Sequence, residues 1–123
     1  MDLPIAGSTL AVSTASTIYQ LSLEAGAYVL NIEGEAAVHS PNGASLHRIP
    51  GEPHTEDLAA ALTGVIVAAV VSDSGELRID LESGHRLVVE PDRYFEAWNL
   101  TAPGRYLVVC MPGGELAVWS AET

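Results

Sequence analysis

The sequence contains no lysine, and its only basic side chains apart from histidine are five arginines. Against these stand 16 Asp and Glu residues, which gives a formal net charge of −11. Binding to nucleic acid or to an anionic membrane surface requires many Lys and Arg side chains, so we expect neither as a partner. Such an acidic chain either uses its charge for solubility alone or is steered toward a basic protein partner.

Cysteine and long hydrophobic runs are also scarce. The single cysteine, Cys110, cannot form an internal disulfide, and its apolar setting LVVCMP predicts a core residue rather than a nucleophile. The longest apolar run, Gly64 to Val71, is far shorter than the ~20 residues of a membrane-spanning helix and predicts a buried strand. The start, MDLPIAGSTLAV, has an acid where a secretory signal has positive charge, so we expect a cytoplasmic protein.

Recognisable catalytic, cofactor and metal motifs are missing. The chain has no Gly-x-Ser-x-Gly elbow, no Gly-x-Gly-x-x-Gly loop and no lysine for a Walker motif. None of His39, His47, His54 and His85 lies two to four positions from another histidine or from Cys110, as zinc ligands often do. His39 and His47 lie on opposite arms of a predicted hairpin and can approach each other. We therefore predict no catalytic residue, no cofactor and no metal site.

The composition favours one folded domain over residues 1–123, because hydrophobic residues make up 48% and charged residues 17%. The clearest strand pattern is Glu76 to Glu82, where Leu77, Ile79 and Leu81 alternate with polar residues. The sequence Glu82-Ser83-Gly84 suits a turn, and His85 to Glu90 returns with Leu87 and Val89 on one face. This stretch predicts a hairpin.

Similar patterns predict further strands and one short helix. Pro41-Asn42-Gly43 indicates a hairpin with a type I′ turn, in which both central residues have positive φ. Residues 55–63 predict the helix, since Thr55 can cap it and two acids follow in its first turn. The other predicted strands cover residues 7–14, 18–24, 27–32, 36–40, 44–49, 65–72, 95–98, 105–111 and 115–120.

A weak internal repeat relates the two halves of the chain. Leu21 to Val29 (LSLEAGAYV) matches Ile79 to Leu87 (IDLESGHRL), and a glycine followed by a strand precedes each. The match arises either by duplication or because both halves solve the same hairpin problem. We predict a mainly β (α+β) fold, an antiparallel sheet of two meander-like pseudo-repeats, residues 7–49 and 64–120, with the short helix between them.

Acidic and aromatic residues gather in one segment without a counterpart in the repeat. This candidate binding segment contains Glu90, Asp92, Arg93, Tyr94, Glu96 and Trp98. Its acids either serve as general acid and base beside a stacking Trp98, or line a solvated strand end while Trp98 or Phe95 packs inward. In a third interpretation, exposed aromatic residues beside acids form a contact site for a basic partner.

The run from Gly75 to Trp119 resembles the bacterial DUF6188 family of uncharacterised small proteins. The resemblance rests on Glu96-Ala97-Trp98 and on Pro112-Gly113-Gly114 with Trp119. A tyrosine more usually precedes Glu-Ala-Trp in that family, whereas this chain has Phe95 there and Tyr94 one place earlier. The resemblance implies a bacterial protein of unknown function and brings no catalytic residues. Small acidic proteins of this kind are often toxin-immunity partners, an association at family level only.

The sequence thus predicts a non-enzymatic acidic binding protein, of an immunity or regulatory type, that engages a basic protein partner. One alternative is a small hydrolase-like enzyme that uses the Glu90, Asp92 or Glu96 carboxylates. The other is a self-associating module: strand-rich halves leave sheet edges to cover, and the mean hydropathy of +0.24 suggests extra apolar surface, so we expect a homodimer.

Overall fold

A computed structural model describes residues 1–119 and shows a mainly β protein, as predicted. The elements are β1 (Thr9–Val12), β2 (Leu21–Ala25), β3 (Tyr28–Ile32), β4 (Ala36–His39), β5 (Ser45–Arg48), α1 (Glu56–Ala61), β6 (Gly64–Val71), β7 (Leu77–Leu81), β8 (Arg86–Val89), β9 (Trp98–Ala102), β10 (Tyr106–Cys110) and β11 (Leu116–Trp119).

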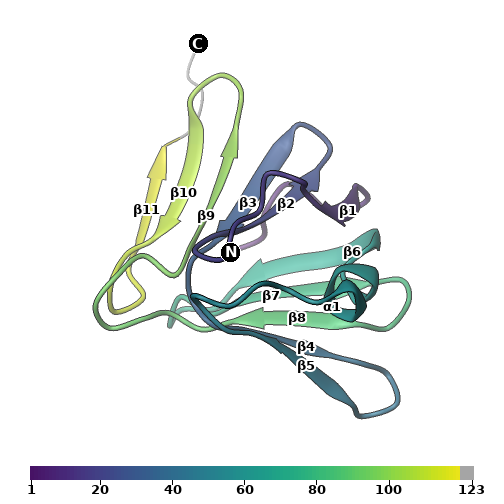
Figure 1. Ribbon diagram of the computed structural model, residues 1–123. Helices are drawn as coiled ribbons and strands as arrows, with labels where there is room; N and C mark the ends of the chain where they lie inside the picture. Colours follow the sequence, from purple (N-terminus) through teal and green to yellow (C-terminus); the bar gives the residue numbers. More distant parts are fainter. Residues whose placement is uncertain (120–123) are drawn as a thin grey trace.

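The strands form one antiparallel sheet that is folded over into two layers. Its order is β11-β10-β9-β3-β2-β1-β6-β7-β8-β4-β5. β1 and β6 share only two residue pairs, and the sheet bends between them (Figure 1). One layer therefore consists of β11, β10, β9, β3, β2 and β1, and the other of β6, β7, β8, β4 and β5. The buried apolar face of each layer points toward the other layer, and α1 contributes Leu58 and Leu62 to the core between them.

Alternation of apolar and polar residues determines which face of each strand is buried. In β7, Leu77, Ile79 and Leu81 are buried as predicted, while Arg78 is exposed. β6 differs from the expectation of a fully buried strand. Val67 and Val70 are 58% and 39% exposed, because a register shift between Ile66 and Ala68 interrupts the pairing with β7 and only one face of the strand meets the core.

From the centre outward, the two layers have the same arrangement of strands. β1-β2-β3 is a meander in one layer and β6-β7-β8 is a meander in the other. The hairpin β4-β5 follows β3 in the chain but pairs with β8, whereas β9-β10 follows β8 but pairs with β3. Each meander therefore receives its next hairpin from the other half of the chain. The matching segments of the repeat occupy equivalent places, β2-β3 and β7-β8; their common origin stays a prediction.

Because of this exchange, the segment that joins β3 to β4 and the segment that joins β8 to β9 cross each other. At the crossing, the backbone N–H groups of Glu33 and Gly34 both donate to the carbonyl oxygen of Ala97, at 2.9 and 3.0 Å. A Cβ atom at Gly34 would approach the Cβ of Ala97 to 3.3 Å, so the backbones meet where both residues are small. The crossing thus joins the two layers through their backbones.

Three local predictions were wrong. The hairpin between β4 and β5 is not a type I′ turn, because Asn42 does not have a positive φ and only Gly43, at 91°, does. Pro41 holds its own φ near −65°, which suits a type I turn followed by a left-handed glycine. Residues 18–20 and 95–97 lie outside the strands, and Tyr19 is 72% exposed instead of sharing the buried face of β2.

A second junction joins the β6-β7 turn to the β10-β11 turn. Gly75 and Gly114 both have positive φ, and a Cβ on either would overlap the backbone of the other turn. The carbonyl oxygen of Gly75 also accepts the indole N–H of Trp98 at 3.2 Å and lies 3.6 Å from the Cys110 Sγ. The two turns therefore pack at a distance that only glycine permits.

We predict that Gly114→Ala destabilises the fold far more than Gly113→Ala. Both glycines have positive φ, so each alanine costs about 1–2 kcal/mol of backbone strain, but only the Cβ at Gly114 meets the Ser74 carbonyl. The overlap should add about 1–3 kcal/mol. Urea unfolding of both variants measures the difference, and equal free energies of unfolding would contradict the close packing of the two turns.

Candidate functional site

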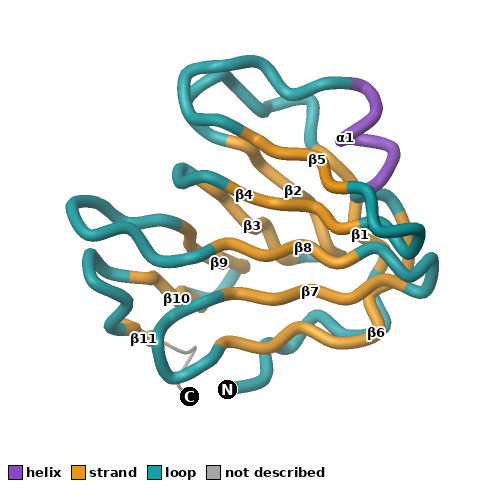
Figure 2. The backbone as a smooth tube through the Cα atoms, turned by 90° about the horizontal axis from the view of Figure 1, so that it is seen from below, coloured by secondary structure: helices purple, strands orange, loops and turns teal. Residues whose placement is uncertain are grey.

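The candidate site is a groove of about 540 Å³ on the outer face of the layer formed by β4, β7 and β8. Figure 2 views this layer from below, with β5, β4, β8, β7 and β6 side by side. The groove is lined by Gly34, Glu35, Ala36, Ala37, His39, His47, Glu76, Val88, Glu90, Pro91 and Asp92.

Small residues on neighbouring strands create the hollow. Ala37 is paired with Val88 of β8 on one side and with His47 of β5 on the other. Its side chain and that of Val88 point outward, because Val38 and Leu87 of the same strands are buried in the core. The crossing adds Gly34 at the end of β4. The floor is therefore low, while longer acidic and histidine side chains form the walls.

The walls carry concentrated negative charge. Within residues 1–119, the groove lining contains four acids, Glu35, Glu76, Glu90 and Asp92, and no arginine. Arg78 lies beside the groove, and its Nη2 is 3.3 Å from Glu76 Oε1, with both side chains partly exposed. This ion pair offsets one of the four acids, and water and salt screen it. The groove is thus a surface that attracts cations.

The two histidines whose approach the sequence suggested both line the groove. His39 and His47 lie on neighbouring strands, both are exposed, and His39 Nδ1 is 2.9 Å from Ser45 Oγ. Within the described chain, no group of three or more His, Cys, Asp or Glu side chains is placed to hold a metal ion. In their neutral form these imidazoles offer a donor and an acceptor without cancelling the charge of the acids.

The structure places two residues of the candidate binding segment in the groove. Glu90 and Asp92 lie at its rim with Pro91 between them. Asp92 has two further contacts: its Oδ1 accepts the N–H of Tyr94 at 2.7 Å, and its carbonyl oxygen accepts the N–H of Gly113 at 2.8 Å. These hydrogen bonds fix the loop after β8 against the β10-β11 turn, so the position of Asp92 at the rim is set by backbone contacts.

Trp98 is fully buried in the core, so a partner cannot contact its ring as a stacking platform. The first residue of β9, it points into the space between the layers, where its indole N–H donates to the Gly75 carbonyl. The structure thus has the arrangement in which Trp98 packs inward, while Phe95 is 40% exposed. The inward face of β9 explains this placement, since Leu100, two residues on, is buried as well.

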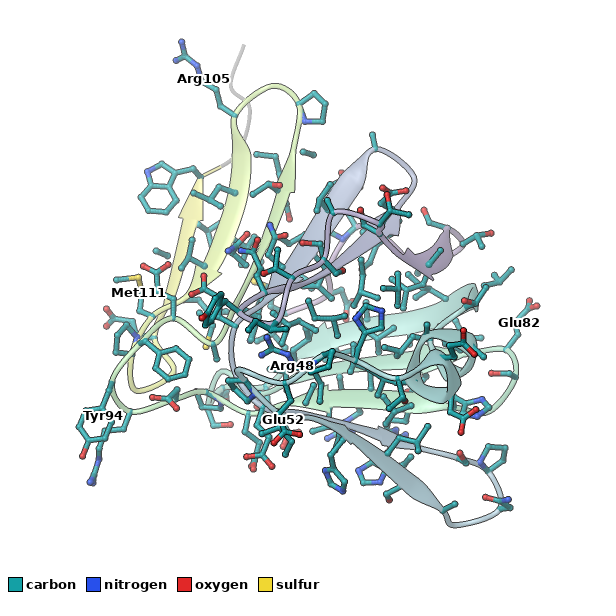
Figure 3. All side chains as sticks on the ribbon, in the orientation of Figure 1. Arg48, Glu52, Glu82, Tyr94, Arg105 and Met111 are labelled. Carbon is teal, nitrogen blue, oxygen red and sulfur yellow. The ribbon has the colours of Figure 1, made fainter. Side chains whose placement is uncertain are left out.

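The other predicted residues lie on the surface beyond the groove. Tyr94 is 80% exposed and points away from the body of the protein (Figure 3). The Arg93 guanidinium carbon is 5.9 Å from the centre of the Tyr94 ring, within reach of a cation–π contact. Glu96 is exposed and does not line the groove. With Phe95, these residues form an exposed loop with two aromatic rings, directly after the acidic rim in the sequence.

An acid–base mechanism has little support from this geometry. Such a pair needs one carboxyl that burial keeps protonated at neutral pH. Glu90 is exposed and Asp92 is only half-buried. Cys110 is fully buried, and burial raises the pKa of its thiol, which disfavours the nucleophilic thiolate.

Arg48 holds the crossing beneath the groove. It is only 2% exposed, and its Nη1 donates to the carbonyl oxygens of Glu33 and Gly34 at 2.9 and 2.8 Å. Its Nη2 donates to the carbonyl of Ile18 at 3.1 Å. Burial lowers the pKa of Arg48, and the nearby Glu33 charge opposes that shift. Figure 3 shows Arg48 inside the protein, so this cation supports the groove without entering it.

Sequence reasoning missed Glu35, Glu76, His39 and His47 as site residues. These residues come from three different strands or their ends, and only the pairing of β4 with β8 brings them together. The crossing that creates this pairing has no signature in the local sequence. An early signal was the polar residue at several outward positions of the predicted strands, but it does not identify which strands are neighbours.

A family model described as a family of unknown function, DUF6188, matches residues 1–120, which include the first half of the chain as well as the part that resembled it most. Neither the curated proteins nor the solved structures contain a match to the chain. In residues 1–119, no helix has the length and apolar character needed to cross a membrane.

We predict that Arg48→Met lowers the free energy of unfolding by about 2–4 kcal/mol, because the carbonyl oxygens of Glu33 and Gly34 lose the Arg48 donor and that of Ile18 keeps only the N–H of Gly51. Arg86→Met is the matched control: Arg86 is exposed and, among the residues that the structure describes, its side chain pairs with Asp80 alone, so the control should change stability far less. Thermal or urea unfolding measures both. Similar losses in the two variants would contradict the structural role of Arg48.

Proposed function

We propose that this chain, which belongs to the DUF6188 family of unknown function, is a non-enzymatic protein that binds a basic segment of a partner protein in its acidic groove. The observation that carries the proposal is the concave lining with four carboxylates and, among the described residues, no arginine. Guanidinium and ammonium groups are the natural ligands of such carboxylates, and Arg engages them with two hydrogen bonds at once.

The groove suits side chains of a protein partner rather than a buried small molecule. It is an open surface on the outer face of a sheet, and its floor of Ala37 and Val88 offers apolar contact to the methylene stems of Arg or Lys. The exposed rings of Tyr94 and Phe95 lie next to the acidic rim in the sequence. Aromatic residues beside a charged recess are typical of protein–protein contact sites.

The net charge of −11 assists this role at longer range. A negative field accelerates the encounter with a positively charged partner, and the contacts in the groove then select the bound arrangement. A protein that works by covering a basic surface needs no catalytic residue of its own. An immunity or regulatory protein acts in this way, by blocking the basic surface with which its partner binds something else.

We predict that Glu90→Gln combined with Asp92→Asn weakens binding of a labelled oligoarginine peptide by about tenfold, because each carboxylate at the surface contributes up to about 1 kcal/mol. Asn keeps an oxygen that can accept the Tyr94 N–H, so the loop should stay in place. Fluorescence anisotropy at low salt measures the affinity.

The matched control is Glu24→Gln combined with Glu82→Gln, which changes the net charge equally. Both residues are exposed and outside the groove, and Figure 3 shows Glu82 at the opposite end of the molecule from Tyr94. The control should lose less than about twofold in affinity. Equal losses in the two variants would show that total charge, not the groove, binds the peptide. No binding by the unaltered protein would contradict the proposal directly.

A further inference from the structure

The two edges of the sheet differ in how they are protected. β5 forms one edge, and α1 packs against it (Figure 2). Its last residue, Arg48, is tied to Ile18 outside the sheet. β11 forms the other edge, and no other strand within residues 1–119 pairs with its free side. An unprotected edge is a template for pairing with another strand.

The hydrogen-bond pattern identifies which groups of β11 face outward. Met111 N–H donates to the Glu115 carbonyl, so these two residues form a hydrogen-bonded pair. Such pairs alternate along antiparallel strands, and Ala117 and Trp119 are therefore the next β11 residues bonded to β10. The N–H and C=O groups of Leu116 and Val118 consequently point to the free edge.

The side chains of β11 also lack the features that normally prevent edge pairing. The strand reads LAVW, without charge or proline, and Val118 and Trp119 are 50% and 54% exposed. Natural edge strands usually carry lysine, proline or a bulge for protection. The apolar edge of β11 therefore gains from being covered.

Charge favours a second copy of the chain as the occupant of this edge. Residues 97–119 carry one positive and one negative side chain, Arg105 and Glu115, so their net charge is zero although the whole chain has −11. Two copies that pair through β11 therefore bring together segments whose net charge is zero. The acids of the groove lie outside this segment, and water and salt screen their charge at the edge.

We propose that the protein forms a symmetric dimer in which the β11 strands of two copies pair antiparallel about Ala117. In this register Leu116 of one copy lies opposite Val118 of the other, and their outward N–H and C=O groups bond to each other. Both copies use the same strand, so the contact is isologous and closes as a dimer. A head-to-tail contact between β11 and β5 would instead form open filaments, which α1 beside β5 disfavours.

Sedimentation equilibrium of the full chain between about 1 and 100 μM tests the dimer directly. The expected result is a concentration-dependent mass that approaches twice the 12.9 kDa of one chain. Val118→Pro removes one outward N–H without removing a bond to β10, so the folded monomer should persist while the dimer dissociates at least about tenfold more readily. Val118→Thr keeps this N–H and the branched side chain, and should dimerise like the unaltered protein.

Circular dichroism of the variants confirms that each is folded. Val118→Lys tests the same edge without changing the backbone. Each added charge would lie opposite the apolar Leu116 of the other copy, and the two lysines would be diagonal neighbours, so this variant should also favour the monomer. A mass of one chain for the unaltered protein over the whole range overturns the proposal. So does a dimer that survives in both the folded Val118→Pro and Val118→Lys variants.

Discussion

The crossing of the two chain connections is the constraint on which the rest of the structure depends. The N–H groups of Glu33 and Gly34 share the carbonyl of Ala97, and the guanidinium of Arg48 takes the carbonyls of Glu33 and Gly34. Because of the crossing, each meander is extended by a hairpin from the other half of the chain, so neither half completes its layer alone. The same few residues that join the layers also bring Gly34 and Glu35 to the groove. Stability and the candidate site thus have one structural origin.

The outer faces of the two layers have equivalent strands but different chemistry. Next to the groove, the β4-β8 pair presents acids and histidines. The equivalent β9-β3 pair presents Asn31 and Asn99, whose side chains are joined by a 3.1 Å hydrogen bond, and Ser22 donates to Asn31 at 2.8 Å. These polar groups satisfy one another, whereas in the groove Glu76 has an exposed ion pair with Arg78 and Asp92 accepts the N–H of Tyr94. One scaffold therefore carries an acidic groove on one outer face and a network of amide and hydroxyl groups on the other.

The sequence predicted most of the strands, because burial of one face imposes a period of two that is readable without neighbours. It also predicted the helix cap, where Thr55 accepts the N–H of Leu58 as expected for an N-cap. Of the residues in the candidate binding segment, Glu90 and Asp92 line the groove, while Trp98 packs in the core. Local patterns do not encode which distant strands pair, and the crossing decides that pairing here. For the same reason Glu35 and His47 had no visible connection to Glu90 before the fold was known.

The most direct test of this account is an NMR titration of the isotope-labelled protein with an oligoarginine peptide, followed through the backbone amide signals. If the crossing builds a cation-binding groove, the largest shifts should fall on Gly34 to His39 and on Val88 to Asp92, with smaller shifts near Glu76. The backbone amide signals of Asn31 and Asn99, on the outer face of the other layer, should not shift. Shifts of equal size on both faces, or shifts centred on Asn31 and Asn99, would contradict the assignment of binding to the groove.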